Sequence, residues 1–324
     1  MLGLLSKIRT RGIALIMITA PALAFVSIVA AADIVNIYDD SAKTTADASG
    51  SWNLVDASLS DGTHSLTAMD MAGNTSAASR PVNGTVVPSI TSFSATPNNV
   101  FDIGGHPYRV ETAGQSYSLT APDAQTLRFE IRPGDHAWFD SGSVDRAEVD
   151  GSAGGYIPSG TPVNIRYQFM VEPNGPNGSF TNTARWFVTA EMHNADTISG
   201  VSTSPPFAIQ LAGNHLQVVA RYCPTGLDPS NRAGNLTMLT LWTDPNPIQA
   251  GQYNKIQIQA NVSNTSIGYL DVWVNGTQVV NYHGPLGYGS PTYWEEGLYR
   301  NAGPSQTVAA SFRDLIITIG SAPP

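Results

Sequence analysis

The chain has 324 residues, a formal net charge of −9 and only 13% charged residues. Its lysines are only Lys7, Lys43 and Lys255, so it lacks the basic patch that binds nucleic acid or an anionic membrane. Its 30 glycines and 22 prolines, with no long helical periodicity after residue 32, are typical of an all-β, loop-rich extracellular protein.

The N-terminal segment begins with basic residues and continues into a long apolar run. Lys7, Arg9 and Arg11 precede the run Ile13–Ala32, which ends in three alanines before Asp33. This order predicts a secretory signal peptide over residues 1–32. The run is also long enough to span a bilayer, so an uncleaved N-terminal anchor is the alternative. Either one predicts that the rest of the chain lies outside the cytoplasm.

A small β module is predicted over residues 33–88. Its alternating runs are Gly50–Val55 and Gly62–Met69, and its string DGTHSLTAMDMAGNTSAAS resembles the closing hairpin of bacterial immunoglobulin-like repeats. The resemblance covers about half of such a repeat. It implies a partial immunoglobulin-like fragment in a bacterial protein that is secreted or held at the cell surface. Residues 89–99 are expected to form a linker or an entry strand.

Residues 100–320 are predicted to form one domain of short strands joined by Gly, Pro and Asn turns. Asn275-Gly276 is a strong signal for a two-residue hairpin. The pattern predicts a concanavalin-like jelly roll of two antiparallel sheets, whose concave face supplies a groove for an extended polymer. The stronger predicted strands are Leu127–Ile131, Val163–Val171, Trp186–His193, Phe207–Leu211, Leu216–Arg221, Lys255–Val262, Tyr269–Val274, Val279–Tyr282 and Ser311–Ile319.

Charged pairs two residues apart point to the same side of a strand, because side chains alternate between its faces. Glu191 and His193 form one such pair, and Arg146 and Glu148 form another. The face of Glu191 and His193 is predicted to include Phe187 and Thr189. The opposite face is predicted to be core and consists of Trp186, Val188, Ala190 and Met192.

Two further segments show the same alternation. One face of the first carries Arg128, Glu130 and Arg132, and one face of the second carries Tyr293, Glu295, Gly297 and Tyr299. Each face alone is typical of the solvent side of a half-exposed strand. Together they hold the Glu, His, Arg and Tyr side chains that general acid–base catalysis uses, so we expect a polar cleft on a sheet.

The ordered segments RFEIRPGD, DRAEV, the strand ending in His193, SPPFAIQLAGNHLQVVAR, DVWVNGTQVV and GLYR resemble the heparin-lyase-I-like polysaccharide lyases. Glucuronan and alginate lyases share their jelly roll. The resemblance implies β-elimination at a uronic acid, in which Gln or Asn neutralises the substrate carboxylate and His or Tyr removes the C5 proton. By position it implies His193 as the base, Tyr299 or Tyr293 as the acid, and Arg146 as a carboxylate clamp.

This chain is more acidic than those lyases at two positions. They usually have Gln where it has Glu191, and Lys where it has Glu295. The same fold also hosts the family 131 glycoside hydrolases, which are similar at Arg146-Ala147-Glu148 and Glu191-Met192-His193. That similarity implies hydrolysis of a β-glucan, with Glu148 and Glu191 as the carboxylate pair.

The sequence therefore favours a secreted polysaccharide lyase, with a glycoside hydrolase as the first alternative and a non-catalytic carbohydrate-binding surface protein as the second. We expect a monomer that binds a polysaccharide and touches a membrane only through the N-terminal anchor. No cofactor and no site metal are expected, although Asp- and Asn-rich loops leave a structural calcium ion open. The expected catalytic residues are Glu191, His193, Tyr299, Arg146 and Glu148, and the expected substrate contacts are Tyr293, Glu295, Arg300 and Arg128.

Overall fold

The computed structural model describes residues 87–195, 203–230 and 234–320, together with the backbone of short strands elsewhere. The chain divides into two compact units, Met1–Ser89 and Ile90–Pro324. In the described part of the chain, no helix is long and apolar enough to span a bilayer. The predicted signal peptide and immunoglobulin-like fragment lie outside the described residues, apart from short strands β1 (Leu15–Ile16), β2 (Asn36–Asp39), β3 (Ala42–Thr45), β4 (Gly62–His64), β5 (Thr67–Met69), β6 (Val82–Gly84) and β7 (Val86–Val87).

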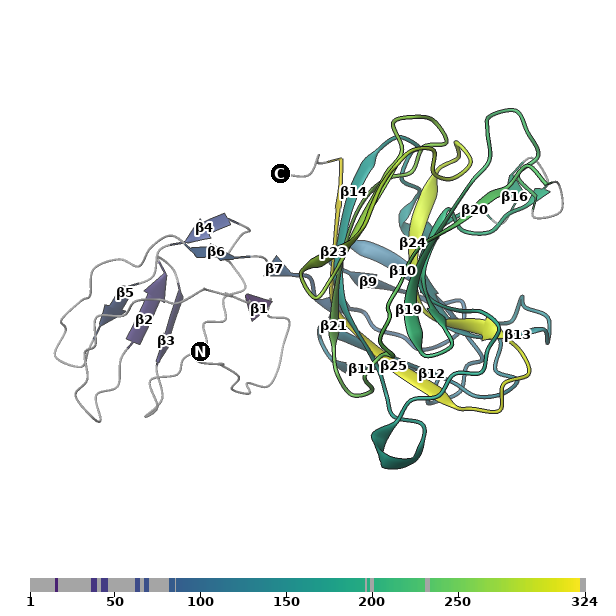
Figure 1. The fold of residues 1–324 in the computed structure, drawn as a ribbon. Helices are drawn as coiled ribbons and strands as arrows, with labels where there is room; N and C mark the ends of the chain where they lie inside the picture. The colour runs from purple at the N-terminus through teal and green to yellow at the C-terminus, as the bar shows by residue number, and fades with distance from the viewer. Residues whose placement is uncertain are drawn as a thin grey trace. The chain divides into compact units, whose positions relative to one another are not determined.

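The second unit is a jelly roll of two antiparallel sheets that face each other (Figure 1). One sheet has nine strands, in the order β20 (Thr237–Thr243), β19 (His215–Tyr222), β18 (Phe207–Ala212), β15 (Phe187–Asn194), β24 (Thr292–Asn301), β13 (Val144–Asp150), β10 (His106–Thr112), β9 (Val100–Ile103) and β8 (Ile90–Thr91). The other has seven, in the order β11 (Leu119–Asp123), β12 (Thr126–Ile131), β25 (Val308–Ile319), β14 (Pro162–Val171), β21 (Asn254–Asn261), β22 (Tyr269–Val274) and β23 (Thr277–His283).

Three minor elements complete the second unit. Strands β16 (Thr197–Ile198) and β17 (Val201–Ser202) form a short hairpin. The 3-10 turn η1 (Gly151–Gly154) follows β13 and is capped by Asp150, whose carboxylate accepts from the Ser152 backbone amide. A second 3-10 turn, η2 (Pro176–Gly178), lies between β14 and β15.

The hydrophobic core lies between the two sheets and is built from alternate residues of their strands. In β12, Leu127, Phe129 and Ile131 are buried in this core, and Phe129 meets the ring of Phe312 from β25 edge to face. Burying one such side chain stabilises the fold by roughly 1.5–3 kcal/mol. The alternation thus leaves the other face of each sheet for polar side chains.

The strands predicted from the sequence are confirmed, with ends that differ by at most a few residues. The hairpin at Asn275-Gly276 is confirmed as well, between β22 and β23. Both residues have positive φ, 52° for Asn275 and 84° for Gly276. These are the residue types that tolerate such a conformation, which explains why this dipeptide was a reliable signal.

Strand β15 corrects one prediction about its faces. Its pairing with both β18 and β24 shifts register between Val188 and Ala190, which marks a β-bulge around Thr189. Phe187 therefore lies in the main core, whereas Val188 packs on the outer face of the sheet beside Tyr299. The predicted assignment of Phe187 to the site face, and of Val188 and Trp186 to the core, was wrong because a bulge reverses the alternation.

Candidate active site

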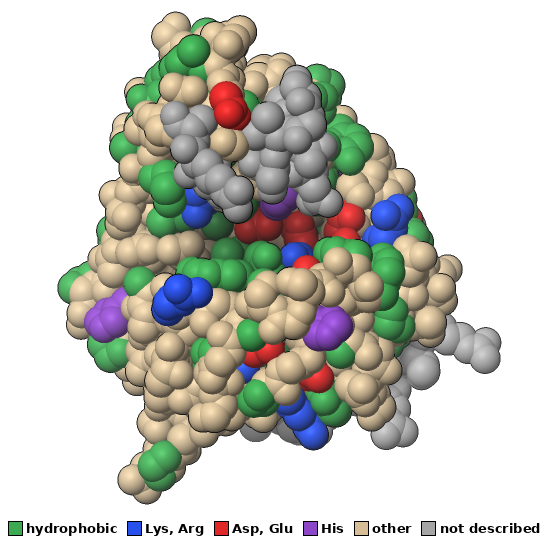
Figure 2. All heavy atoms as spheres, turned by 90° about the vertical axis from the view of Figure 1, so that its right-hand side faces the viewer, with side chains coloured by type: hydrophobic (Ala, Val, Ile, Leu, Met, Phe, Trp, Pro, Cys, Tyr) green, Lys and Arg blue, Asp and Glu red, His purple; other side chains and the backbone are tan. Residues whose placement is uncertain are grey.

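The outer face of the nine-stranded sheet carries most of the residues that the sequence pointed to. Strands β15, β24 and β13 are neighbours, and Glu191 of β15 lies opposite Glu295 of β24. On the other side of β24, Arg146 lies opposite Tyr299. Acidic side chains, with histidine and basic ones, gather in a hollowed part of this face (Figure 2). We call this region the cleft.

A cluster of four carboxylates surrounds a single guanidinium at the floor of the cleft. Nη1 of Arg146 donates to Oε2 of Glu148 at 2.7 Å, to Oε1 of Glu295 at 3.2 Å and to Oε2 of Glu111 at 3.5 Å. Its Nε donates to Oδ2 of Asp140 at 2.8 Å. The guanidinium is thus already bound by the protein's own carboxylates. The predicted role of Arg146 as a clamp for a substrate carboxylate would need a guanidinium that is free to bind the substrate.

Burial and mutual repulsion make two carboxyl groups of this cluster hard to ionise. Burial raises the pKa of Glu148 well above its usual range, against the lowering effect of Arg146, and the charges of Glu191 and Glu111 raise it further. Burial also raises the pKa of Glu295, with Glu148 adding to the effect. We call Arg146 with Glu111, Asp140, Glu148 and Glu295 the acidic cluster.

Gly297 makes room for this cluster. It lies opposite Glu148 and has a φ of 145°. A Cβ built on it would come within 2.6 Å of the Glu148 Cα atom and within 2.4 Å of the Ala147 carbonyl oxygen. Only glycine therefore allows β13 and β24 to approach here with the Glu148 side chain between them.

His193 is held with one ring nitrogen beside Glu191 in the cleft. Its Nδ1 is hydrogen-bonded to the backbone carbonyl of Asn194 and lies 3.3 Å from the Tyr293 hydroxyl. Because a carbonyl oxygen only accepts, Nδ1 carries a proton, and Nε2 is an acceptor whenever the ring is neutral. Nε2 lies 3.8 Å from Oε1 of Glu191. This is the tautomer that a general base requires.

Tyr299 is a protonated phenol beside the acidic cluster. Burial raises its pKa to about 12, although Arg146, whose Cζ lies 3.8 Å from the centre of its ring, acts to lower it. Its ring also meets that of Trp186 edge to face, with 4.8 Å between centroids. Tyr299 and His193 are half-buried, whereas the Glu148 and Glu191 side chains lie beneath the surface. A ligand in the cleft reaches the phenol and the imidazole first.

Three residues of this site were missed by the sequence prediction. Glu111 lies opposite Glu148 in the pairing of β10 with β13, and Asp140 comes from the loop before β13. Arg221 of β19 faces Glu191 and Tyr288, and its burial lowers its pKa. Alternation in β10 and β19 would have put Glu111 and Arg221 on an outer face, but strand order was needed to bring them here. No sequence signal marks Asp140.

Two predicted substrate contacts lie elsewhere. Arg128 belongs to β12 in the seven-stranded sheet, where its Nε donates to Oε1 of Glu172 at 2.6 Å, so it does not reach the cleft. Arg300 has no exposed surface, because it points to the inner face of β24 and pairs with the equally buried Asp145 at 2.9 Å. Both predictions were wrong, since alternation decides the face of a strand but not its sheet or its burial.

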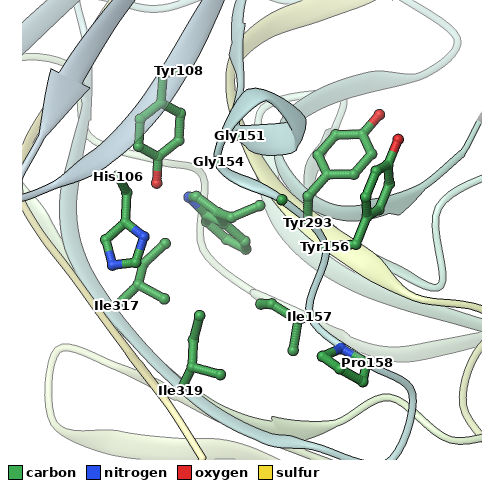
Figure 3. A pocket seen from close by; sticks show the side chains of 12 residues that line it. His106, Tyr108, Gly151, Gly154, Tyr156, Ile157, Pro158, Tyr293, Ile317 and Ile319 are labelled. Carbon is green, nitrogen blue, oxygen red and sulfur yellow. The ribbon is translucent and has the colours of Figure 1, made fainter.

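A separate pocket of about 170 Å³ opens where β10, η1 and β25 meet. Figure 3 shows the rings of Tyr156 and Tyr293 side by side, with both hydroxyls pointing away from it. Its lining is mainly aromatic and aliphatic, including Tyr108 and Ile317, and contains no carboxylate. It therefore does not include the acidic cluster. Among the described residues, no group of three or more His, Cys, Asp or Glu side chains is arranged to hold a metal ion.

Several solved structures are similar to this chain. An endo-β-1,4-glucuronan lyase from the fungus Trichoderma reesei has 14% identity and a TM-score of 0.49, over 65% of this chain and 86% of its own. The alginate lyase AlyC3 has 12% identity and a TM-score of 0.43, over 72% and 89%. The PL7 alginate lyase AlyA1 from Zobellia galactanivorans has 12% identity and a TM-score of 0.41, over 72% and 95%.

Sequence comparison gives the assignment. None of the curated proteins matches this chain. The model of the polysaccharide lyase family matches residues 106–316, which is more than half of the chain and includes every strand that contributes to the cleft. The protein therefore belongs to the polysaccharide lyase family.

Proposed function

We propose that this polysaccharide lyase cleaves a uronic-acid-containing glycan by β-elimination in the cleft. The observation that carries the proposal is the pairing of an imidazole acceptor with a protonated phenol on one sheet face, at His193 and Tyr299. Elimination needs one group that takes a proton and one that gives a proton, and it needs no water. The ordered motifs further favour the heparin-lyase-I-like group.

The proposed reaction assigns one proton transfer to each group. Nε2 of His193 takes the proton from C5 of the uronate, and the electron pair of that bond forms the C4–C5 double bond. The bond between C4 and the glycosidic oxygen breaks, and the Tyr299 hydroxyl protonates the leaving oxygen. The products are an unsaturated uronate and a new reducing end. The raised pKa of Tyr299 fits an acid better than a base.

Glu191 is proposed to share a proton with the substrate carboxylate. It is buried next to His193 and faces Glu295 across the strand pair. Two ionised carboxylates at this position would repel each other, whereas a carboxyl and a carboxylate form a strong hydrogen bond. Such a proton also makes the C5 hydrogen more acidic, because it withdraws charge from the uronate. Arg146 holds the acidic cluster in place, and Arg221 supplies the second cation near Glu191.

The hydrolase alternative lacks an accessible carboxylate pair. A hydrolytic acid or nucleophile must touch the glycosidic bond. The Glu148 side chain has no exposed surface, and its Oε2 is bound by Arg146 at 2.7 Å. Extracellular location is part of the proposal and is supported by the basic and then apolar N-terminal segment, residues 7–32.

The test is the product and pH profile of the wild type and of Glu191→Gln on polyglucuronate, alginate and a neutral β-glucan. We expect the wild type to give reducing ends together with near-ultraviolet absorbance, on a polyuronate only. Its kcat/KM should fall as pH rises above the usual range of a carboxyl, because the raised pKa values of Glu148 and Glu295 mean that the cleft gains negative charge there.

Glu191→Gln should raise kcat/KM at pH 8 about tenfold, since an amide does not repel a uronate. Glu172→Gln is the matched control, because it removes one negative charge from the other sheet. Reducing ends without ultraviolet gain, together with an inactive Glu191→Gln, would contradict elimination and support hydrolysis.

A further inference from the structure

Two aromatic side chains stand exposed at one end of the cleft. Trp138 and Phe139, in the loop between β12 and β13, are each 49% exposed. Their rings meet edge to face, with 4.9 Å between centroids and an interplanar angle of 89°. Two such rings side by side form an exposed apolar patch, and burying it against a ligand would gain free energy.

This aromatic pair is joined to the acidic cluster. Asp140, the residue after Phe139, accepts a hydrogen bond from Nε of Arg146 at 2.8 Å. The Arg146 guanidinium carbon lies 5.3 Å from the centre of the Phe139 ring and 3.8 Å from that of Tyr299. The exposed rings therefore adjoin the Tyr299 end of the cleft.

The loop that carries the pair is tied down on both sides. Ala137 is fully buried, and its carbonyl accepts from the Asp140 amide at 3.1 Å. The Arg146 amide donates to the Asp135 carbonyl at 2.8 Å, and the Gly134 amide donates to Asp145 at 2.9 Å. The rings are thus presented by a preformed loop, so little conformational entropy would be lost when a ligand binds.

We propose that Trp138 and Phe139 form an aromatic subsite that binds a sugar ring of the polysaccharide at the Tyr299 end of the cleft. The inference rests on the proposed function. A sugar ring presents a face of C–H bonds whose slight positive charge matches the negative face of an aromatic ring. Stacking also needs no cation. That suits a cleft in which four carboxylates surround one arginine, because ionic contacts alone would hold a polyanion poorly there.

The test compares Trp138→Ala and Trp138→Phe with the wild type on the polyuronate that the wild type cleaves, as the polymer and as a size series of its oligomers. We expect Trp138→Ala to raise KM for the polymer about tenfold, as is typical for the loss of one aromatic stacking contact, with a much smaller effect on kcat. The increase in KM caused by Trp138→Ala should become smaller with shorter oligomers, and it should vanish for oligomers too short to reach the subsite. Trp138→Phe should recover most of the loss.

Ile267→Ala is the matched control, because Ile267 is 61% exposed in the turn between β21 and β22 of the other sheet and should leave KM unchanged. Equal effects of Trp138→Ala on all oligomer lengths, or no effect on the polymer, would overturn the subsite. The proposed function is tested apart from it by retardation of the full-length protein in native gels that contain polyglucuronate or alginate. If the wild type is retarded but cleaves neither polymer, elimination fails, and loss of retardation in Trp138→Ala alone still supports the subsite.

Discussion

Two arginine–carboxylate clusters lie on opposite sides of the sandwich, and only one of them belongs to the cleft. On the outer face of the seven-stranded sheet, Arg128 pairs with Glu172 at 2.6 Å and with Glu130 at 2.9 Å, and Arg132 pairs with Glu130 at 2.7 Å. In the acidic cluster of the other sheet, Arg146 alone faces four carboxylates. The residue types are the same, but the charges balance only in the first.

Charge balance and burial give the two clusters opposite chemistry. For Glu130, burial acts to raise the pKa, but hydrogen bonds from Arg132 and Arg128 outweigh it and the pKa falls. For Glu148, burial raises the pKa and a single arginine does not offset it. The cluster of Arg128 and Arg132 therefore behaves as a surface ion-pair network. In the acidic cluster, Glu148 and Glu295 hold protons that are released only above the usual pH range of a carboxyl, as is common at catalytic sites.

The largest difference between the outer faces of the two sheets should appear in kcat. We expect His193→Ala and Tyr299→Phe to lower kcat by about 10²–10⁴-fold, because each removes one proton-transfer group. Arg128→Ala on the seven-stranded sheet should leave kcat within about twofold of the wild-type value. The measurement is initial rates on the cleaved polyuronate, with circular dichroism to show that each variant is folded. A loss of similar size in Arg128→Ala would mean that the catalytic face has been misassigned.

The next difference should appear in stability. Arg146→Met removes the only cation of the acidic cluster together with the hydrogen bonds that it donates to four carboxyl groups, so we expect the free energy of unfolding at pH 7 to fall by about 3–5 kcal/mol. Arg128→Met, at a side chain that is 25% exposed, should cost about 1 kcal/mol or less. Urea denaturation of both variants gives the comparison. Equal losses would contradict the contrast between the clusters.

The smallest expected effect is on the pH dependence of stability. It concerns Glu296, whose side chain faces the core from the same strand as Glu295. Burial raises its pKa from 4.5 to about 7, while its hydrogen bond from Trp294 acts to lower it. The folded state then binds more protons than the unfolded state between these values. The contribution of Glu296 to the free energy of unfolding is therefore fully present below pH 4.5 and is lost as pH rises to about 7. The total loss is about 3 kcal/mol, at about 1.4 kcal/mol per pKa unit.

Glu296→Gln should remove this loss, because the amide oxygen can still accept from Trp294. The variant should match the wild type near pH 4 and exceed it above pH 7 in urea denaturation. Glu130→Gln, in the cluster of Arg128 and Arg132, should instead be less stable than the wild type at high pH and match it at low pH. The lowered pKa of Glu130 means that its contribution is present above its unfolded pKa and is lost as pH falls. The same pH response in both variants would show that global charge, and not local burial, sets the effect.

The sequence predicted the fold better than it predicted the site. Alternation and the Asn275-Gly276 turn identified the strands, because side-chain periodicity and turn conformation are local properties. Alternation also placed Glu191 with His193, and Glu295 with Tyr299, on shared faces. It failed at the bulge around Thr189, since one extra residue reverses every assignment on one side of it.

What the sequence determined by itself is the β periodicity, the acidic composition and the ordered motifs that match the family. Only the tertiary structure decided that Arg128 lies on the other sheet, that Arg300 is buried against Asp145, and that Glu111 and Asp140 complete the acidic cluster. The physical reason is that strand order and burial depend on contacts between segments far apart in the chain. A carboxylate becomes a proton carrier only when such contacts remove it from water and limit its counter-charge.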